Sequence, residues 1–192
     1  VIDEGHNLVA AARDQLISKI TSHSFDDLFT FFSLNNKSYK KEIEQLLMII
    51  PSAESHLLNL EARSRLLRTD IKSFFDTYAQ SKRTELSKSR YNEVKVRYID
   101  PQSEFQETFP LPFDVLTDIN NYMSEVEAFI SEVSKEKDQI DKVYFQELNV
   151  SLNRMRSSLN TFEQALAHKE DWVTWSSLLK ATKVNRTSLN TG

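Results

Sequence analysis

The chain has 192 residues, of which 40% are hydrophobic and 27% charged, and its formal net charge is -4. This composition favours a soluble globular domain over a disordered chain. The absence of cysteine excludes disulfides, cysteine-ligated zinc and an iron–sulfur cluster within this segment. No apolar run reaches the roughly 18 residues that a membrane-spanning helix needs, so we expect a cytoplasmic domain without membrane contact.

Glycine and proline divide the chain into segments. Glycine occurs only as Gly5 and Gly192, whereas sheet-rich folds need glycine in their turns, so the chain between them is predicted to be mostly helical. Residues 7–34 predict two short helices broken near residues 22–24. Ser24, with Asp27 three residues later, suits the start of the second of these helices.

Two further helices are predicted between residues 38 and 81. Residues 38–50 form the first, and Pro51 suits the first turn of the next, where its missing amide is not needed. Apolar residues then recur at steps of three and four, as on one face of an amphipathic helix. These residues are Leu57, Leu60, Leu67, Ile71, Phe74 and Tyr78.

A short strand is predicted after this helix. Val94, Val96 and Tyr98 alternate with Lys95 and Arg97, which is the pattern of a strand with one buried face. Pro101 and the polar residues after it turn the chain towards residues 105–109. We therefore expect a β-hairpin near residues 91–110.

Residues 112–169 predict a helical hairpin. One apolar seam consists of Leu116, Ile119, Met123, Val126, Ile130 and Val133, and the other of Ile140, Tyr144, Leu148, Leu152, Met155, Leu159, Phe162 and Leu166. The seams meet at the polar residues 134–138, and two antiparallel helices that turn there would bury them against each other. Residues 172–176 and 183–189 predict two short strands. The expected fold is mainly α, a helical bundle with long antiparallel helices and a small antiparallel β element.

The most specific motif is the string Val1-Ile2-Asp3-Glu4-Gly5-His6-Asn7-Leu8. Two apolar residues before Asp-Glu are typical of the end of a Walker B strand. The alternative is an incidental pair of carboxylates at a helix N-terminus, where they suit the helix dipole. The string resembles the DEAH-type motif of DinG/XPD-family superfamily-two DNA helicases, typically V-x-D-E-A-H-N-L. It departs from that form at Gly5, where the family usually has Ala.

The resemblance implies a part of a bacterial DinG-like helicase. Residues 1–8 would end the motor motif, residues 9–170 would be a helical arch domain inserted after it, and residues 171–192 would be strands returning to the motor domain. In the parent protein, whose cofactors are ATP and Mg²⁺, Asp3 would hold Mg²⁺ through water, Glu4 would activate the attacking water, and His6 would couple hydrolysis to the other motor lobe. The abrupt start without an initiator Met is expected to be a cut inside that protein.

The segment alone is expected to be inactive. A phosphate-binding G-x-x-x-x-G-K-[ST] loop cannot occur when Gly5 and Gly192 are the only glycines. We therefore expect the chain by itself to bind no cofactor and to hydrolyse no ATP.

Charge is distributed unevenly along the chain. Residues 98–147 hold three bases and twelve acids, whereas residues 61–97 hold five acids and ten bases. The ten bases are Arg63, Arg65, Arg68, Lys72, Lys82, Arg83, Lys88, Arg90, Lys95 and Arg97. They suit a path for single-stranded DNA, with Tyr78, Tyr91 or Tyr98 available for base stacking. The alternative is a solvated face, or one paired with the acidic segment.

The leading hypothesis is an accessory arch domain of an ATP-dependent 5′-to-3′ DNA helicase. It would help to enclose and guide single-stranded DNA, and its partners would be that strand and the motor domains of the same chain. The alternative is a structural or protein-binding helical module without nucleic-acid contact. A DNA role requires the bases of residues 61–97 to lie on one concave face, whereas a docking role requires an exposed apolar patch.

Overall fold

The computed structural model describes residues 18–33, 37–101, 103–104, 111–135, 142–167, 173–180 and 186–191. The chain forms two compact units. We call Val1–Thr21, Phe75–Pro110 and Asn160–Gly192 the sheet unit, and Ser22–Phe74 and Leu111–Leu159 the helical unit. Within the described residues, no helix is both long and apolar enough to cross a membrane.

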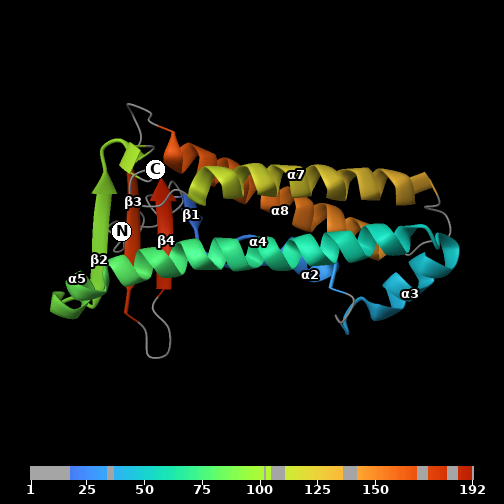
Figure 1. Ribbon diagram of the computed structural model, residues 1–192, viewed down its shortest axis with the longest axis horizontal. Helices are drawn as coiled ribbons and strands as arrows, with labels where there is room; N and C mark the ends of the chain where they lie inside the picture. The colour runs from blue at the N-terminus through green and yellow to red at the C-terminus, as the bar shows by residue number, and fades with distance from the viewer. Residues whose placement is uncertain are drawn as a thin grey trace, which may run out of the picture. The chain divides into compact units, whose positions relative to one another are not determined.

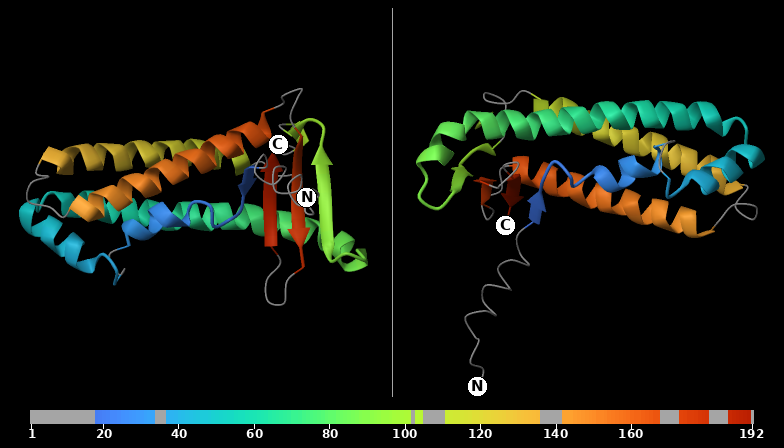
Figure 2. Two further views of the ribbon diagram at one scale, coloured as in Figure 1. Left: turned by 180° about the vertical axis from the view of Figure 1, so that it is seen from behind. Right: turned by 90° about the horizontal axis from the view of Figure 1, so that it is seen from below.

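The helical unit is built around three long helices. They are α4 (Ala53–Ser81), α7 (Leu111–Val133) and α8 (Lys142–Leu166), and the short helices α2 (Asp26–Phe31) and α3 (Lys40–Ile49) accompany them. Within this unit α4, α7 and α8 run side by side, and α7 and α8 are antiparallel (Figure 1, Figure 2). The predicted helical hairpin is therefore confirmed.

The predicted apolar seams form the cores of the two units. All six residues of the α4 seam are at most 4% exposed. In α7 and α8, the residues of the predicted seams are buried as well, apart from the half-buried Ile130 and from Ile140, which lies outside the described residues. Steps of three and four put these side chains on one face of each helix, so burial of that face accounts for the helices better than propensity alone.

Helix α2 contributes aromatic side chains to two clusters in the helical unit. Phe29 lies edge-on to Tyr122 of α7, with ring centroids 5.5 Å apart, and Phe32 lies edge-on to Tyr122 and Phe129 at 6.3 and 5.9 Å. A second cluster joins Phe31, Tyr39 and Tyr144. Such pairs add about 0.5–1.5 kcal/mol each beyond the burial of their area, so this six-residue helix is held by packing.

The sheet unit contains a four-stranded sheet in the order β1-β4-β3-β2 (Figure 1). Its strands are β1 (Ser18–Ile20), β2 (Glu93–Tyr98), β3 (Thr174–Leu179) and β4 (Arg186–Thr191), and all neighbouring pairs are antiparallel. The short helix α5 (Arg83–Lys88) precedes β2. The strand predicted from the alternation of residues 94–98 and the two strands predicted near the end of the chain are confirmed.

Tyrosine hydroxyls connect the sheet to the end of α4. The hydroxyls of Tyr78 and Tyr98 both contact the Ser176 hydroxyl, the second of them at 2.7 Å. Ser176 is buried in the middle of β3, so these contacts satisfy a polar group that water does not reach. The contact of Tyr98 with Ser176 also orients β2, so that its face with Val94, Val96 and Tyr98 points towards the interior of the unit.

Three expectations about local boundaries need correction. Residues 18–20 form a strand rather than the end of a helix, because they pair with β4 near the other end of the chain. Helix α2 begins at Asp26 with Phe25 as its N-cap, so Ser24 does not start it. Helix α4 begins at Ala53, which places Pro51 in the turn before the helix rather than in its first turn.

The expected β-hairpin near residues 91–110 is described only for its first strand. Strand β2 pairs along its whole length with β3, from Glu93 opposite Leu179 to Tyr98 opposite Thr174. Residues 105–109, which were expected to supply the second strand, lie outside the described residues.

Candidate nucleic-acid interface

The residues of the helicase-like motif lie outside the described part of the chain. Asp3, Glu4 and His6 belong to residues 1–17, so their roles stay predictions from the resemblance. The basic residues, in contrast, all lie within the described ranges. Their positions and partners decide which of them are available to bind an anion.

Four of the ten bases lie on the part of α4 that belongs to the helical unit, and three of these already have partners. Arg63 pairs with Glu125 of α7, and Arg65 donates to Glu61 one turn earlier at 2.6 Å. Arg68 donates to Asp26 at 3.0 Å and lies over the Phe29 ring, 5.7 Å from its centroid. Arg63 and Arg68 therefore tie α4 to α7 and α2, whereas the Arg65 pair stays within α4.

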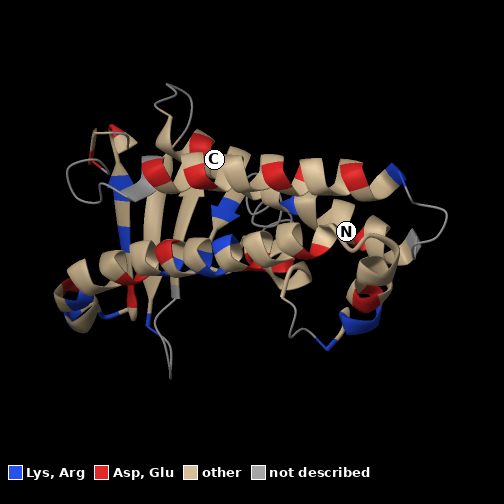
Figure 3. Cartoon of the chain, turned by 45° about the vertical axis from the view of Figure 1, so that its right-hand side comes forward, with Lys and Arg blue, Asp and Glu red and all other residues tan. Residues whose placement is uncertain are grey.

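Among the described residues of the acidic segment, Glu125 is the only one that pairs with any of the ten bases, so the pairing that the alternative interpretation expected is found for Arg63 alone. Acidic residues recur along α7 in Figure 3. Besides the Arg63–Glu125 pair, Glu127 pairs with Arg156 of α8, and Glu132 lies 3.1 Å from His56 of α4. Exposed pairs of this kind contribute about 0–1 kcal/mol each. For the bases of α4, the structure therefore favours a role within the domain, with exposed Lys72 the exception.

The other six bases lie in the sheet unit, from the N-cap of α5 to β2; Figure 3 draws Lys and Arg in blue. Lys82 donates to Glu85 at 2.9 Å, and Lys95 lies 3.4 Å from Glu93. The remaining four are exposed and form no ion pair with any residue that the structure describes; they are Arg83, Lys88, Arg90 and Arg97. Residues 82–97 contain only two acids, so the charge of these bases is largely uncompensated locally.

The turn between α5 and β2 has a defined local structure. Buried Leu86 anchors α5, and the Ser89 hydroxyl donates to the Glu93 carbonyl at 2.6 Å while it accepts from the Tyr91 amide at 3.4 Å. Asn92 takes a left-handed conformation with φ of 57°, which short polar side chains tolerate better than most. The Lys180 amide then donates to the Asn92 carbonyl at 2.8 Å.

Only one of the three candidate stacking tyrosines is available at this surface. Tyr78 is buried, and Tyr98 is half-buried with its hydroxyl on Ser176. Burial of Tyr98 raises the pKa of its hydroxyl above the usual range. Tyr91, in contrast, is 88% exposed. We name the exposed set Arg83, Lys88, Arg90, Tyr91, Lys95 and Arg97 the α5–β2 surface.

The strand register explains why Lys95 and Arg97 belong to this surface. They lie opposite Ser177 and Trp175 of β3, on the face of β2 that does not carry Val94, Val96 and Tyr98. The period of two therefore puts the bases outside and the apolar side chains inside, as predicted.

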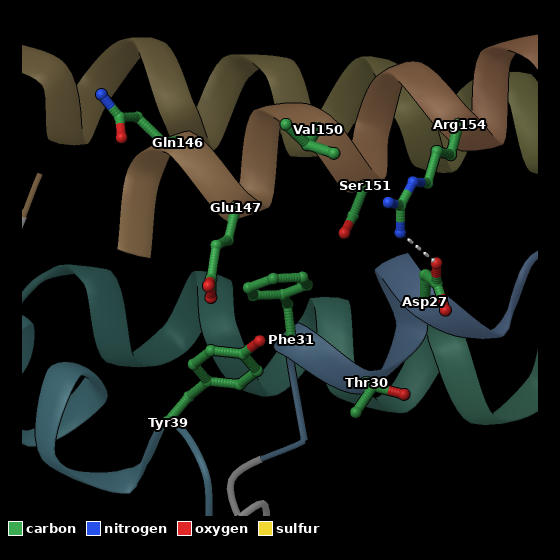
Figure 4. A pocket seen from close by; sticks show the side chains of 9 residues that line it. All are labelled: Asp27, Thr30, Phe31, Tyr39, Gln146, Glu147, Val150, Ser151 and Arg154. Atoms are coloured by element: carbon green, nitrogen blue, oxygen red, sulfur yellow. Dashed lines mark hydrogen bonds and ion pairs between the residues drawn. The ribbon is translucent and has the colours of Figure 1, made fainter. Parts of the chain in front are cut away.

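A cavity of about 430 Å³ in the helical unit was not predicted from the sequence. It is lined by residues of α2, by Tyr39 and by residues of α8, as Figure 4 shows. Among its lining residues, an ion pair joins Arg154 to Asp27 at 2.9 Å. The only sequence signal is Ser151, a polar residue on the apolar face of α8 between Leu148 and Leu152. No group of His, Asp or Glu suited to holding a metal ion occurs among the described residues.

Comparisons with known proteins add no assignment. No protein-family model matches the chain, and no curated protein matches it either. The functional argument therefore rests on the residues themselves.

Proposed function

We propose that this chain is an accessory helical domain of an ATP-dependent 5′-to-3′ DNA helicase of the DinG type, and that its α5–β2 surface contacts single-stranded DNA. The helicase part rests on the resemblance of residues 1–8 to the DEAH-type motif. The mainly helical fold with a small sheet agrees with the arch domain that the resemblance implies, but it also suits many other functions.

The observation that carries the DNA contact is the set of exposed, uncompensated bases beside an exposed tyrosine. Arg83, Lys88 and Arg90 are free to neutralise phosphates, and Tyr91 offers a ring face on which a base can stack. The ion-paired bases of α4 would first have to release their carboxylates. The proposed contact is therefore narrower than the whole basic segment.

Fluorescence anisotropy of a labelled single-stranded oligonucleotide tests this contact. The triple charge reversal Arg83→Glu, Lys88→Glu and Arg90→Glu removes three phosphate partners, so binding should be lost at moderate salt. Binding to the unaltered chain should weaken with salt, with a slope of about -2 to -3 in log–log form for three to four contacts. Tyr91→Ala should weaken binding by about tenfold, because stacking contributes roughly 1–3 kcal/mol per base.

A matched triple reversal on the helical unit controls for the change in net charge. Lys37, Lys40 and Lys41 are exposed near the start of α3, and the triple change to Glu alters the net charge by the same amount. Binding should survive this change. Equal losses in both triple variants would show that the chain binds DNA through overall charge only, and the proposed contact would then be wrong.

The helicase assignment is tested separately, in a protein that contains both motor lobes around this sequence. The resemblance gives Glu4 the role of activating water, so Glu4→Gln should abolish ATP hydrolysis and leave ATP binding in place. Unchanged hydrolysis would remove the basis of the assignment without affecting the DNA-binding result.

A further inference from the structure

The cavity beside α2 and α8 is lined by a buried serine whose hydroxyl faces the cavity and has no partner among the described residues. Ser151 is 5% exposed and lines the cavity, and in Figure 4 its hydroxyl points into the space between α8 and α2. It forms no hydrogen bond with any described residue. By comparison, the helical residues Ser124 and Ser134 donate to carbonyls four residues earlier, at 3.1 and 2.6 Å.

The charge around this hydroxyl is mostly negative. The carboxylates of Asp27 and Glu147 line the cavity, and Arg154 is the one base among its lining residues. Tyr39 reports the local potential: burial raises the pKa of its hydroxyl, and a hydrogen bond to Glu147 and the charges of Glu147, Glu42 and Asp27 raise it further. A cation is therefore favoured there over an anion.

The remaining walls suit an alkyl chain. Phe31 and Tyr39 are stacked at 4.4 Å, and Val150 is 49% exposed at the edge of the cavity. A protonated amine could donate to the Glu147 carboxylate and to the Ser151 oxygen while its methylene groups lie on these side chains.

We infer that this cavity binds the side chain of a lysine residue presented by a partner peptide. A volume of about 430 Å³ exceeds what a butylammonium group fills, so space remains for the adjoining peptide backbone. The Arg154 side chain is 66% exposed, and its guanidinium has more donors than its contact with Asp27 uses. A peptide carbonyl can accept from these donors, whereas a free polyamine has no acceptor to offer.

Chemical-shift titration of the isotope-labelled 192-residue chain tests this inference. The probe is Nα-acetyl-lysine N-methylamide, and the same compound acetylated on Nε keeps the stem but lacks the charge. We expect saturable shifts at the amides of residues 147–154 with a dissociation constant of about millimolar, as suits one side chain. The neutral compound should produce no such shifts, and putrescine should bind several-fold more weakly.

Point variants separate binding from folding. Glu147→Gln should weaken binding of the lysine compound by about tenfold or more, and Ser151→Ala by about threefold, since each loses one hydrogen bond to the ammonium group. Ser151→Ala should not lower the thermal midpoint, because the hydroxyl has no partner to lose. Glu54→Gln, an exposed change in the first turn of α4, should leave binding unchanged.

Three results would overturn the inference. One is equal binding of the neutral compound, which would make the site a purely apolar one. Another is unchanged affinity in Glu147→Gln, which would place the ammonium group elsewhere. The third is putrescine binding as tightly as the lysine compound. The backbone contact with Arg154 would then contribute nothing, and the ligand would not need to be a peptide.

Discussion

Two buried tyrosines should respond in opposite directions to the loss of a hydroxyl group. Tyr122, in the helical unit, is fully buried, and its hydroxyl forms no hydrogen bond of normal geometry with any residue that the structure describes; the nearby Ser64 hydroxyl donates instead to the Glu61 carbonyl. Tyr78, in the sheet unit, is 2% exposed, and its hydroxyl contacts Ser176. Replacement by phenylalanine keeps the ring contacts in both cases and removes only the hydroxyl.

The magnitudes follow from the cost of burying a polar group. A buried hydroxyl without a partner costs about 1–3 kcal/mol. Tyr122→Phe should therefore raise the free energy of unfolding by about 1 kcal/mol, at the low end of this range because neighbouring side chains adjust to the buried hydroxyl. Tyr78→Phe should lower it by about 1 kcal/mol, because it removes a hydrogen bond and leaves Ser176 with Tyr98 alone. For a chain of this size, 1 kcal/mol corresponds to roughly 2–4 °C in the unfolding midpoint.

Urea unfolding followed by two signals would measure these changes. Far-ultraviolet circular dichroism reports mainly the helices, whereas tryptophan fluorescence reports the sheet unit, where both Trp172 and Trp175 are found in the sequence. Tyr122→Phe should raise the circular-dichroism midpoint, and Tyr78→Phe should lower the fluorescence midpoint, with unchanged slopes. A lower midpoint in Tyr122→Phe at constant slope would refute the reasoning, since it would mean that the hydroxyl is hydrogen-bonded in solution.

Three further changes test other parts of the fold. Burial raises the pKa of several tyrosines above the ordinary value of 10.0, so above that pH they keep their proton in the folded chain while the unfolded chain loses it. The free energy of unfolding should therefore be constant below about pH 10 and fall above it, by up to about 1.4 kcal/mol per pH unit for each tyrosine. Urea midpoints measured across that range would record the fall. These tyrosines are Tyr98, Tyr122 and Tyr144. Asn92→Ala should cost about 1 kcal/mol in thermal unfolding because of its left-handed backbone, whereas Asn92→Gly should be nearly neutral. Phe32→Ala should cost about 3–5 kcal/mol in urea unfolding, and Met48→Ala, at 82% exposure, should cost less than about 0.5 kcal/mol.

The helices were predictable from the sequence because their signal is local. Leu57, Leu60 and Leu67 share one face of α4 wherever that helix lies, and a chain almost free of glycine and proline offers few ways to break it. The same applies to the alternation of Val94 and Val96 in β2. A helix or strand that is determined by residues within a few positions of one another can be predicted without knowing which distant segments pack against it.

The errors occurred where distant residues decide the structure. Ser18, Lys19 and Ile20 form a strand because Leu189, Asn190 and Thr191 lie beside them, and nothing within residues 7–34 indicates such a partner. Helix α2 begins at Asp26 because its two phenylalanines, Phe29 and Phe31, pack against distant rings, which outweighs the capping preference of Ser24. The cavity beside α8 also joins residues more than one hundred positions apart, such as Asp27 and Arg154.

The availability of the bases follows the same logic. In the sequence Arg68 and Arg90 are equivalent members of one basic segment, and the count of charges was correct for both. In the structure Arg68 is held by Asp26, 42 residues away, while Arg90 lies on a turn fixed by its neighbour Ser89 and meets no carboxylate among the described residues. The density of charge is thus a property of the local sequence, whereas the freedom of a charge to bind a ligand is a property of the fold. A nucleic-acid site inferred from a basic segment should therefore be limited to the bases that the fold leaves without carboxylate partners. Among the described residues these are Lys72 of α4 and four members of the α5–β2 surface, Arg83, Lys88, Arg90 and Arg97.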